Sequence, residues 1–167
     1  MSKTLVAYFS ASGVTAGLAK TVAAAVNGDL HEIVPIHPYT PADLNWNNKQ
    51  SRSSIEMSDK SFRPIIANKV ENMEDYDVIY VGFPIWWYVA PTIINTFLEQ
   101  YDFNGKTVIP FATSGGSGMG DTNAELAPSC KGAVLKDGKR FSVSATEEEI
   151  KAWANSLICN TGGNNKW

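Results

Sequence analysis

The stretch YFSASGVTAGLAKTV, residues 8–22, begins in one pattern and ends in another. Residues 3–9 end in the apolar run LVAYF and predict a buried strand. Apolar residues then recur every four positions, which predicts a helix over residues 15–26. The seam between the two elements, SASGVT, consists of small and hydroxyl residues around one glycine. A strand that leads through such a seam into a helix is the first unit of an alternating α/β chain.

The alternation of strands and helices continues along the rest of the sequence. The run DVIYVG at residues 77–82 is apolar without alternation, which is typical of a strand covered on both faces. A crossover helix is expected within residues 43–57, although this part is polar and rich in Asn and Ser. The remaining expected elements are strands at 29–36 and 107–113, a strand within 133–142 that Asp137 and Gly138 interrupt or precede, a helix after Pro91, and a helix from Thr146 with a capping box.

One α/β domain over residues 1–167 accounts for these elements. It has five parallel strands, helices on both faces of the sheet and right-handed crossovers. A chain of 167 residues is long enough to bury one core without disulfides or metal. Hydrophobic residues at 44% and charged residues at 19% are typical of a soluble globular protein.

The charge and the cysteines exclude several classes of function. The formal net charge is −3 and no run of Lys or Arg occurs, so we expect no nucleic-acid partner and no membrane partner. No segment is long and apolar enough to span a bilayer, and no export signal precedes the first strand, so we expect a cytoplasmic protein. Cys130 and Cys159 lack C-x-x-C spacing, so we expect neither a metal site nor a disulfide framework.

The first candidate ligand loop is the seam at residues 10–15. In parallel α/β sheets, ligands bind beyond the carboxyl ends of the strands. A helix N-terminus offers unpaired N–H groups and a partial positive charge, so backbone donors and short hydroxyls can hold a phosphate there without a lysine. A helix cap needs only one hydroxyl, whereas Ser10, Ser12 and Thr15 supply three. We therefore favour a phosphate site over a plain cap.

The second loop, GFPIWWYVAP at residues 82–91, contains two adjacent tryptophans and a tyrosine. Large aromatic side chains in a loop are costly unless something flat covers them or they pack on the core. Adjacent residues rarely face the same way, so we expect one tryptophan to pack on the core and the other to face a planar ligand. We favour Trp86 for the packing, and Trp87 or else Tyr88 for the ligand.

The third loop is TSGGSGMGD at residues 113–121. Counted from Gly116, the G-x-G-x-x-G pattern places Asp121 where its last glycine belongs, so a dinucleotide fingerprint is excluded. The sequence GKT at residues 105–107 is not a triphosphate loop either, because a strand follows it. Glycines let bare backbone approach a ligand and donate N–H groups to its polar edge, and a flexible linker is the alternative.

Together the three loops predict a phosphate site, aromatic side chains against a flat ring, and N–H donors at the polar edge of that ring. This combination indicates FMN. On these loops the chain resembles the flavodoxins and, more closely, a bacterial flavodoxin-like group with P-I-W-W and T-S-G-G-S-G loops. The resemblance covers nearly the whole chain, including residues 43–64. It implies a three-layer flavodoxin-like fold, with a five-stranded parallel sheet in the order 2-1-3-4-5 and FMN bound without a covalent link.

The resemblance also implies which residues bind the flavin, and it assigns no catalytic residue. It hints that Asp43, Trp46 and Arg52 contribute to a wall near the flavin. One departure concerns the second loop, where no glycine follows Pro84, although many flavodoxins turn a glycine peptide there toward the reduced flavin. The implied cofactor-binding residues are Ser10, Ser12, Gly13, Val14 and Thr15 at the phosphate, Pro84, Ile85, Trp86, Trp87 and Tyr88 around the ring, and Thr113, Ser114, Gly115, Gly116 and Ser117 at its pyrimidine end.

Three functions fit these expectations. The first, which we favour, is a low-potential electron carrier that passes electrons between redox partner proteins, a reductase and an acceptor. The second is an FMN-dependent reductase that takes hydride from NAD(P)H and reduces a quinone or another small acceptor. The mild charge of −3 supports this second function, because carriers that dock by electrostatics often have a stronger acidic field. The third is a non-redox FMN-binding or structural protein.

Overall fold

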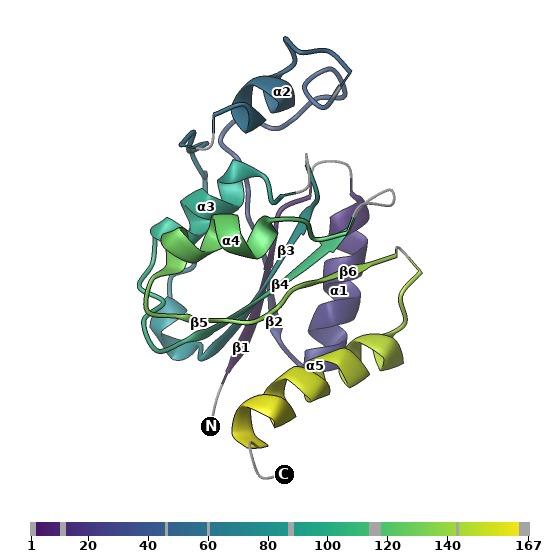
Figure 1. The fold of residues 1–167 in the computed structure, drawn as a ribbon, viewed down its shortest axis with the longest axis vertical. Helices are drawn as coiled ribbons and strands as arrows, with labels where there is room; N and C mark the ends of the chain where they lie inside the picture. The colour runs from purple at the N-terminus through teal and green to yellow at the C-terminus, as the bar shows by residue number, and fades with distance from the viewer. Residues whose placement is uncertain are drawn as a thin grey trace.

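A parallel sheet in the order β2-β1-β3-β4-β5 lies between two layers of helices (Figure 1). This order confirms the one expected from the resemblance. The computed structural model describes residues 3–10, 13–45, 47–59, 61–86, 89–113, 118–142 and 144–163. The strands are β1 Thr4–Tyr8, β2 Asp29–Glu32, β3 Val78–Pro84, β4 Thr107–Thr113, β5 Val134–Leu135 and β6 Lys139–Phe141.

Helices cover both faces of the sheet, as expected. They are α1 Val14–Val26, α2 Arg52–Met57, α3 Thr92–Glu99, α4 Thr122–Leu126 and α5 Glu147–Gly163, with the short 3-10 helices η1 Met73–Asp75 and η2 Ala127–Cys130. The sequence patterns identified α1, α3 and α5, but they gave no sign of α4 and η2, which together span only nine residues, 122–130.

Two hydrophobic cores lie on the two faces of the sheet, because successive side chains of a strand point to opposite faces. In β1, Val6 and Tyr8 pack with buried residues of α1 and α5, and Leu5 and Ala7 pack with those of α3. In Figure 1, α1 and α5 accordingly lie on one face of the sheet, with α3 and α4 on the other. The helical layers hold the strands so that β1, β3 and β4 end at one edge.

The predicted fifth strand is divided into β5 and β6, which both pair in parallel with β4. Residues 136–138 separate them. A Cβ atom added at Gly138 would lie 3.0 Å from the carbonyl oxygen of Pro110 and 2.4 Å from Cε of Met119. The chain can pass this close to β4 only because residue 138 has no side chain. Of the two alternatives that the sequence left for Asp137 and Gly138, the structure shows the interruption.

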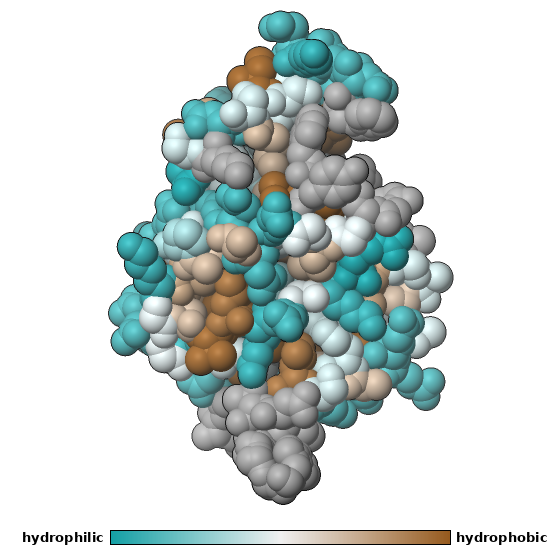
Figure 2. All heavy atoms as spheres, viewed as in Figure 1, coloured by the Kyte–Doolittle hydropathy of each residue, from teal (hydrophilic) through white to brown (hydrophobic). Residues whose placement is uncertain are grey.

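The segment of residues 37–65, between β2 and β3, has little regular structure. Of its described residues, those at 52–57 alone are helical, so the predicted helix over 43–57 is wrong for most of its length. The Oδ1 atoms of Asn45 and Asn48 accept hydrogen bonds from the amides of residues 47 and 50. Such side-chain bonds to nearby backbone compete with a helix. The segment stands out from the sheet at the top of Figure 1, and Figure 2 shows a mostly hydrophilic surface there.

Two further predictions from the sequence are that the chain has no membrane span and no metal site. The structure bears on both only for the residues that it describes. No helix there has the length and apolar content that a membrane span requires. The described ranges also hold no group of three His, Cys, Asp or Glu side chains that could bind a metal ion.

Candidate functional site

The three predicted loops begin side by side at the carboxyl edge of the sheet. Just beyond β1, the amide of Phe9 donates to the carbonyl oxygen of Gly82 in β3 at 2.9 Å. Just beyond β3, the amide of Ile85 donates to the carbonyl oxygen of Thr113, the last residue of β4, also at 2.9 Å. These hydrogen bonds continue the strand pairing into the loops, so the loops start from fixed positions.

The N-terminus of α1 opens at this edge and is capped by Ser10. The Oγ atom of Ser10 accepts hydrogen bonds from the amides of Gly13 at 3.0 Å and Ala16 at 3.1 Å. Gly13 has φ +93°, in the left-handed region that favours glycine. A helix leaves four N–H groups at its start without an intrahelical partner. Ser10 binds two of them, and the amides of Val14 and Thr15 are the other two.

A pair of buried hydroxyls joins the first loop to the third. The Oγ1 atoms of Thr15 and Thr113 lie 2.8 Å apart, and either can be the donor. The two residues are 98 positions apart in the sequence, and both side chains are buried. The hydrogen bond therefore ties the start of α1 to the end of β4. We call Ser10, Gly13, Thr15 and Thr113 the hydroxyl end of the site.

Three aromatic rings pack together at the same edge. The ring centroids of Phe9 and Tyr39 are 5.5 Å apart, those of Tyr39 and Trp86 5.5 Å, and those of Phe9 and Trp86 5.8 Å, all edge to face. Phe9 is buried, whereas Tyr39 and Trp86 are half-buried. Trp86 thus packs on the core, which is the position that we favoured for it from the sequence. We call these three residues the aromatic end.

Trp86 is also held through its backbone. Its amide donates to the carbonyl oxygen of Val89 at 2.9 Å, and the amide of Val89 donates back to Trp86 at 3.1 Å. These two hydrogen bonds close the second loop at its base. The ends of the predicted ring-binding stretch are therefore fixed relative to each other.

Some of the predicted binding residues can be placed and others cannot. Pro84 and Ile85 are half-buried at the end of β3, and Val14 is exposed at the start of α1. Eight further residues predicted at or near the flavin lie outside the described part of the chain. They are Ser12, Trp87, Tyr88, Ser114, Gly115, Gly116 and Ser117, together with Trp46, which the resemblance placed in a wall near the flavin.

Two residues at the aromatic end and beside it, Tyr39 and Glu56, were not among the predicted ones. The Tyr39 hydroxyl donates to Oε1 of Glu56 at 2.5 Å, and the guanidinium carbon of Arg52 lies 3.7 Å from the Tyr39 ring centroid. Burial and the Glu56 carboxylate raise the pKa of Tyr39, so its hydroxyl stays protonated as a donor. These residues lie in a polar segment without periodicity, which gave no signal for such contacts.

Comparison with known proteins identifies the family. The flavodoxin family model matches residues 3–157. The chain belongs to the flavodoxin family. Among solved structures, it is similar to a candidate flavoprotein from Bacteroides eggerthii DSM 20697, with 51% identity over 95% of this chain and 99% of that one and a TM-score of 0.90. No curated protein matches the chain.

More distant members share the fold with this chain. A flavoprotein in complex with FMN from Lactobacillus acidophilus NCFM is 23% identical, over 92% of this chain and 99% of that one, with a TM-score of 0.68. Oxidised Flavodoxin 2 from Bacillus cereus is 20% identical, over 94% and 98% of the two chains, with a TM-score of 0.52. These likenesses show the flavodoxin fold.

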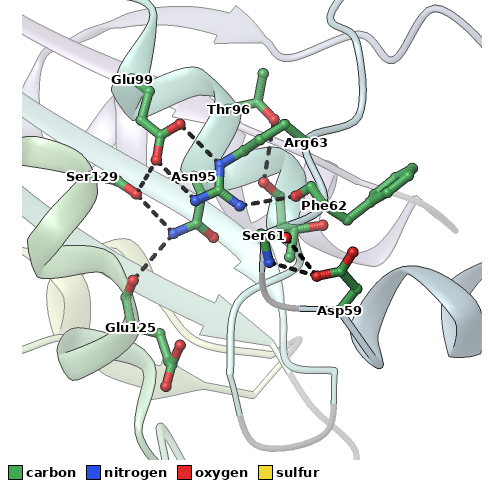
Figure 3. A network of polar contacts seen from close by, with 10 residues as sticks. Asp59, Ser61, Phe62, Arg63, Asn95, Thr96, Glu99, Glu125 and Ser129 are labelled. Atoms are coloured by element: carbon green, nitrogen blue, oxygen red, sulfur yellow. Dashed lines mark hydrogen bonds and ion pairs between the residues drawn. The ribbon is translucent and has the colours of Figure 1, made fainter.

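A second polar cluster lies on the α3 side of this flavodoxin fold (Figure 3). Arg63 donates from Nε and Nη2 to the two carboxylate oxygens of Glu99, at 2.9 and 3.0 Å. Glu99 also accepts a hydrogen bond from Ser129 at 2.7 Å, and Asn95 donates to Ser129 at 2.9 Å. The hydrogen bonds from Arg63 and Ser129 lower the pKa of Glu99.

A cavity of about 310 Å³ adjoins this cluster. Its lining includes Met57 at the end of α2, Val89 at the base of the second loop, and Asp121 at the end of the third loop, besides Arg63 and Glu99. The cavity therefore borders two of the loops that meet at the carboxyl edge of the sheet.

Proposed function

We propose that this chain binds FMN without a covalent link at the carboxyl edge of its sheet and carries electrons between redox partner proteins. Bound FMN supplies the electron-transfer chemistry, and the protein supplies binding, orientation and the electrostatic surroundings. The observation that carries the proposal is the open N-terminus of α1 beside two threonine hydroxyls. Membership of the flavodoxin family supports it.

The hydroxyl end fits a phosphate group. The amides of Val14 and Thr15 have no partner within the helix, and the first turn of α1 contains no acidic residue to offset its partial positive charge. Gly13 has open space where a Cβ atom would stand, with no heavy atom of the described residues within 4 Å other than those of Gly13 itself and its chain neighbours. Backbone donors and hydroxyls at a helix N-terminus are a recurrent means of phosphate binding. In our proposal, Ser12 of the same loop adds a further hydroxyl.

The aromatic end fits a flat ring system. Trp86 is half-buried against Phe9 and Tyr39 and begins the loop in which Trp87 and Tyr88 are predicted to face the flavin. The solved complex of the Lactobacillus acidophilus flavoprotein with FMN supports FMN as the flavin here. In our proposal, the pyrimidine end of the ring lies toward Thr113 and residues 114–117.

The cavity supports a second candidate function, an FMN-dependent reductase of a small acceptor. It borders the second and third loops, and a volume of about 310 Å³ is in the range of small-molecule pockets. A carrier that docks proteins needs no such cavity. The acceptor in this second function is a small molecule such as a quinone, and NAD(P)H is the donor.

Stepwise anaerobic reduction of the FMN-loaded protein separates the two functions. A single-electron carrier is expected to develop long-wavelength absorbance at half reduction and to react slowly with NADPH. A reductase is expected to bleach directly with NADPH and to be reoxidised by a quinone. If the apo protein does not bind added FMN at all, neither function holds.

A further inference from the structure

Arg52 contacts several parts of the segment of residues 37–65. Its Nη1 donates to the carbonyl oxygens of His37 at 2.7 Å and Pro38 at 3.3 Å. Its Nε donates to Oε2 of Glu56 at 2.9 Å, and a carboxylate oxygen of Asp43 lies 3.8 Å from Nη1. One guanidinium group thus contacts the start of the segment, Asp43 and Glu56 of helix α2.

The same guanidinium lies over one face of the Tyr39 ring, with its carbon 3.7 Å from the ring centroid. Glu56 binds both partners, because one carboxylate oxygen accepts from the Tyr39 hydroxyl and the other from Arg52. The Glu56 side chain is 5% exposed, so this carboxylate is almost completely removed from water. Tyr39 is therefore fixed at its face and at its hydroxyl.

Tyr39 in turn packs on Trp86. It contacts Trp86 and Phe9 edge to face, each at 5.5 Å between centroids. Among the described residues of the segment, the one helix is α2, and its six residues are too few for a helix that is stable by itself.

We infer that Arg52 is a positioning residue of the flavin site: it holds Tyr39 against Trp86 and so sets the aromatic end in place before a flavin binds. This inference rests on the proposed FMN site. It gives the segment of residues 37–65 a role in flavin affinity without direct contact between Arg52 and the flavin. A lysine at position 52 could supply the charge, but not the planar stack and the several fixed donors.

The main test compares Arg52→Gln with Lys3→Gln. The two cations are matched, because each contacts a carboxylate and lies over a tyrosine ring whose hydroxyl donates to that carboxylate, Tyr39 for Arg52 and Tyr76 for Lys3. Lys3 directly precedes β1, at the edge of the sheet opposite the site. Dissociation constants for FMN and riboflavin are measured by flavin fluorescence, at a temperature where far-ultraviolet circular dichroism shows each variant to be folded. We expect Arg52→Gln to raise both dissociation constants by about tenfold, because an aromatic contact and a cation–π contact are lost. Lys3→Gln is expected to change neither by more than about twofold.

A second pair of variants covers the case in which Arg52→Gln does not fold. Tyr39→Phe keeps the ring and its stack on Arg52, and is expected to bind FMN within about twofold of wild type. Tyr39→Leu removes the ring and is expected to bind about tenfold more weakly. A purely structural role for the segment would affect Tyr39→Phe and Tyr39→Leu alike.

The outcomes of these tests separate the two proposals. If wild type binds FMN and both Arg52→Gln and Tyr39→Leu bind it equally well, the positioning role is wrong and the FMN site stands. If Lys3→Gln raises the two dissociation constants as much as Arg52→Gln does, the effect is general and the positioning role is also wrong. If wild type binds neither FMN nor riboflavin, it is the proposed function that fails.

Discussion

The hydroxyl end and the aromatic end of the site are built in different ways. At the hydroxyl end, the contacts are made by backbone amides and short hydroxyls that sit where β1, α1 and β4 begin or end. At the aromatic end, Trp86 packs on Tyr39, which comes from a segment whose described residues form a single six-residue helix. Arg52 and Glu56 hold that tyrosine through side-chain contacts.

This difference shows which parts of a site follow from the fold and which need their own support. The sheet and helix α1 fix the hydroxyl end, because regular backbone hydrogen bonds set the positions of its amides and of Thr15 and Thr113. The aromatic end needs several side chains to act together, so a single change there affects the shape of the site. FMN and riboflavin differ only by the phosphate, and comparing them therefore tests the two ends separately.

The largest effect is expected at Phe9, which packs at the aromatic end and directly precedes Ser10 of the hydroxyl end. Phe9 is 1% exposed and contacts both Tyr39 and Trp86. Phe9→Ala should lower the free energy of unfolding of the apo protein by about 3–5 kcal/mol, measured by urea denaturation. Phe9→Leu, the control, should cost under about 1.5 kcal/mol. Equal, small losses in both variants would mean that the two ends share no common core residue.

The next effect sharpens the assignment of the hydroxyl end. Replacing both Ser12 and Thr15 with Ala should raise the dissociation constant of FMN by about tenfold or more. Each charge-assisted hydrogen bond that is lost contributes about 1.5–3 kcal/mol to binding. Riboflavin should bind almost unchanged, because it lacks the phosphate. Isothermal titration measures both affinities, and Thr21→Ala in the same helix is the control. An equal loss for the two flavins would make the loop a structural cap.

A smaller effect concerns the hydroxyl pair itself. Thr15→Val and Thr113→Val should each leave one buried hydroxyl without its partner, at a cost of about 1–3 kcal/mol in unfolding free energy. The double variant should be more stable than the sum of the two losses predicts, because neither hydroxyl remains. Thermal and urea unfolding of the four proteins form a double-mutant cycle. Strict additivity would show that the 2.8 Å contact contributes nothing.

The smallest effect on stability is expected at Arg63 and Glu99, which belong to neither the hydroxyl end nor the aromatic end of the site. Their side chains are 33% and 41% exposed, so Arg63→Gln should lower the free energy of unfolding by at most about 1 kcal/mol at neutral pH. The pKa of Glu99 is lowered in the folded protein from its ordinary value of 4.5. The pair therefore stabilises the fold above pH 4.5, and this contribution is lost as the pH falls through the lower, folded pKa.

Urea unfolding of wild type and Arg63→Gln between pH 3 and pH 7 checks the sign of this last effect. The two curves of stability against pH should converge toward the acid end. Ser156→Ala is a control, because its exposed hydroxyl donates to the carbonyl oxygen of Trp153 in α5, on the other face of the sheet from Glu99. A gap that widens on acidification would contradict the lowered pKa of Glu99.

All four residues of the hydroxyl end are among those predicted from the sequence, whereas of the three residues of the aromatic end only Trp86 is. The seam of residues 10–15 is local, because a strand, a glycine and a helix start follow one another within a few positions. Trp86 was also recognisable, since it stands in an aromatic loop after a buried strand. Tyr39 was not, because its partner Trp86 is 47 positions away and neither hydrophobic periodicity nor a turn signal links them.

The predicted fold was accurate where hydrophobic pattern decides structure. The strand at 107–113 and the helix ending at Val26 follow from uninterrupted or periodic apolar residues. The predicted helix over 43–57 was wrong before residue 52, because Asn side chains there bind neighbouring amides instead of leaving the backbone to a helix. The short α4 had no signal, since five residues are fewer than two turns and show no period.

The hydrogen bond between Thr15 and Thr113 has a consequence for the nascent chain. A ribosome makes the N-terminal part of a protein first, so α1 and its opening loop exist long before residue 113 has been synthesised. Until then Thr15 has no partner and β3 lacks its neighbour β4. A chain truncated before β4 would thus lack the complete hydroxyl end, and added FMN could not rescue it. If FMN binds as proposed, its binding would therefore distinguish finished chains from unfinished ones.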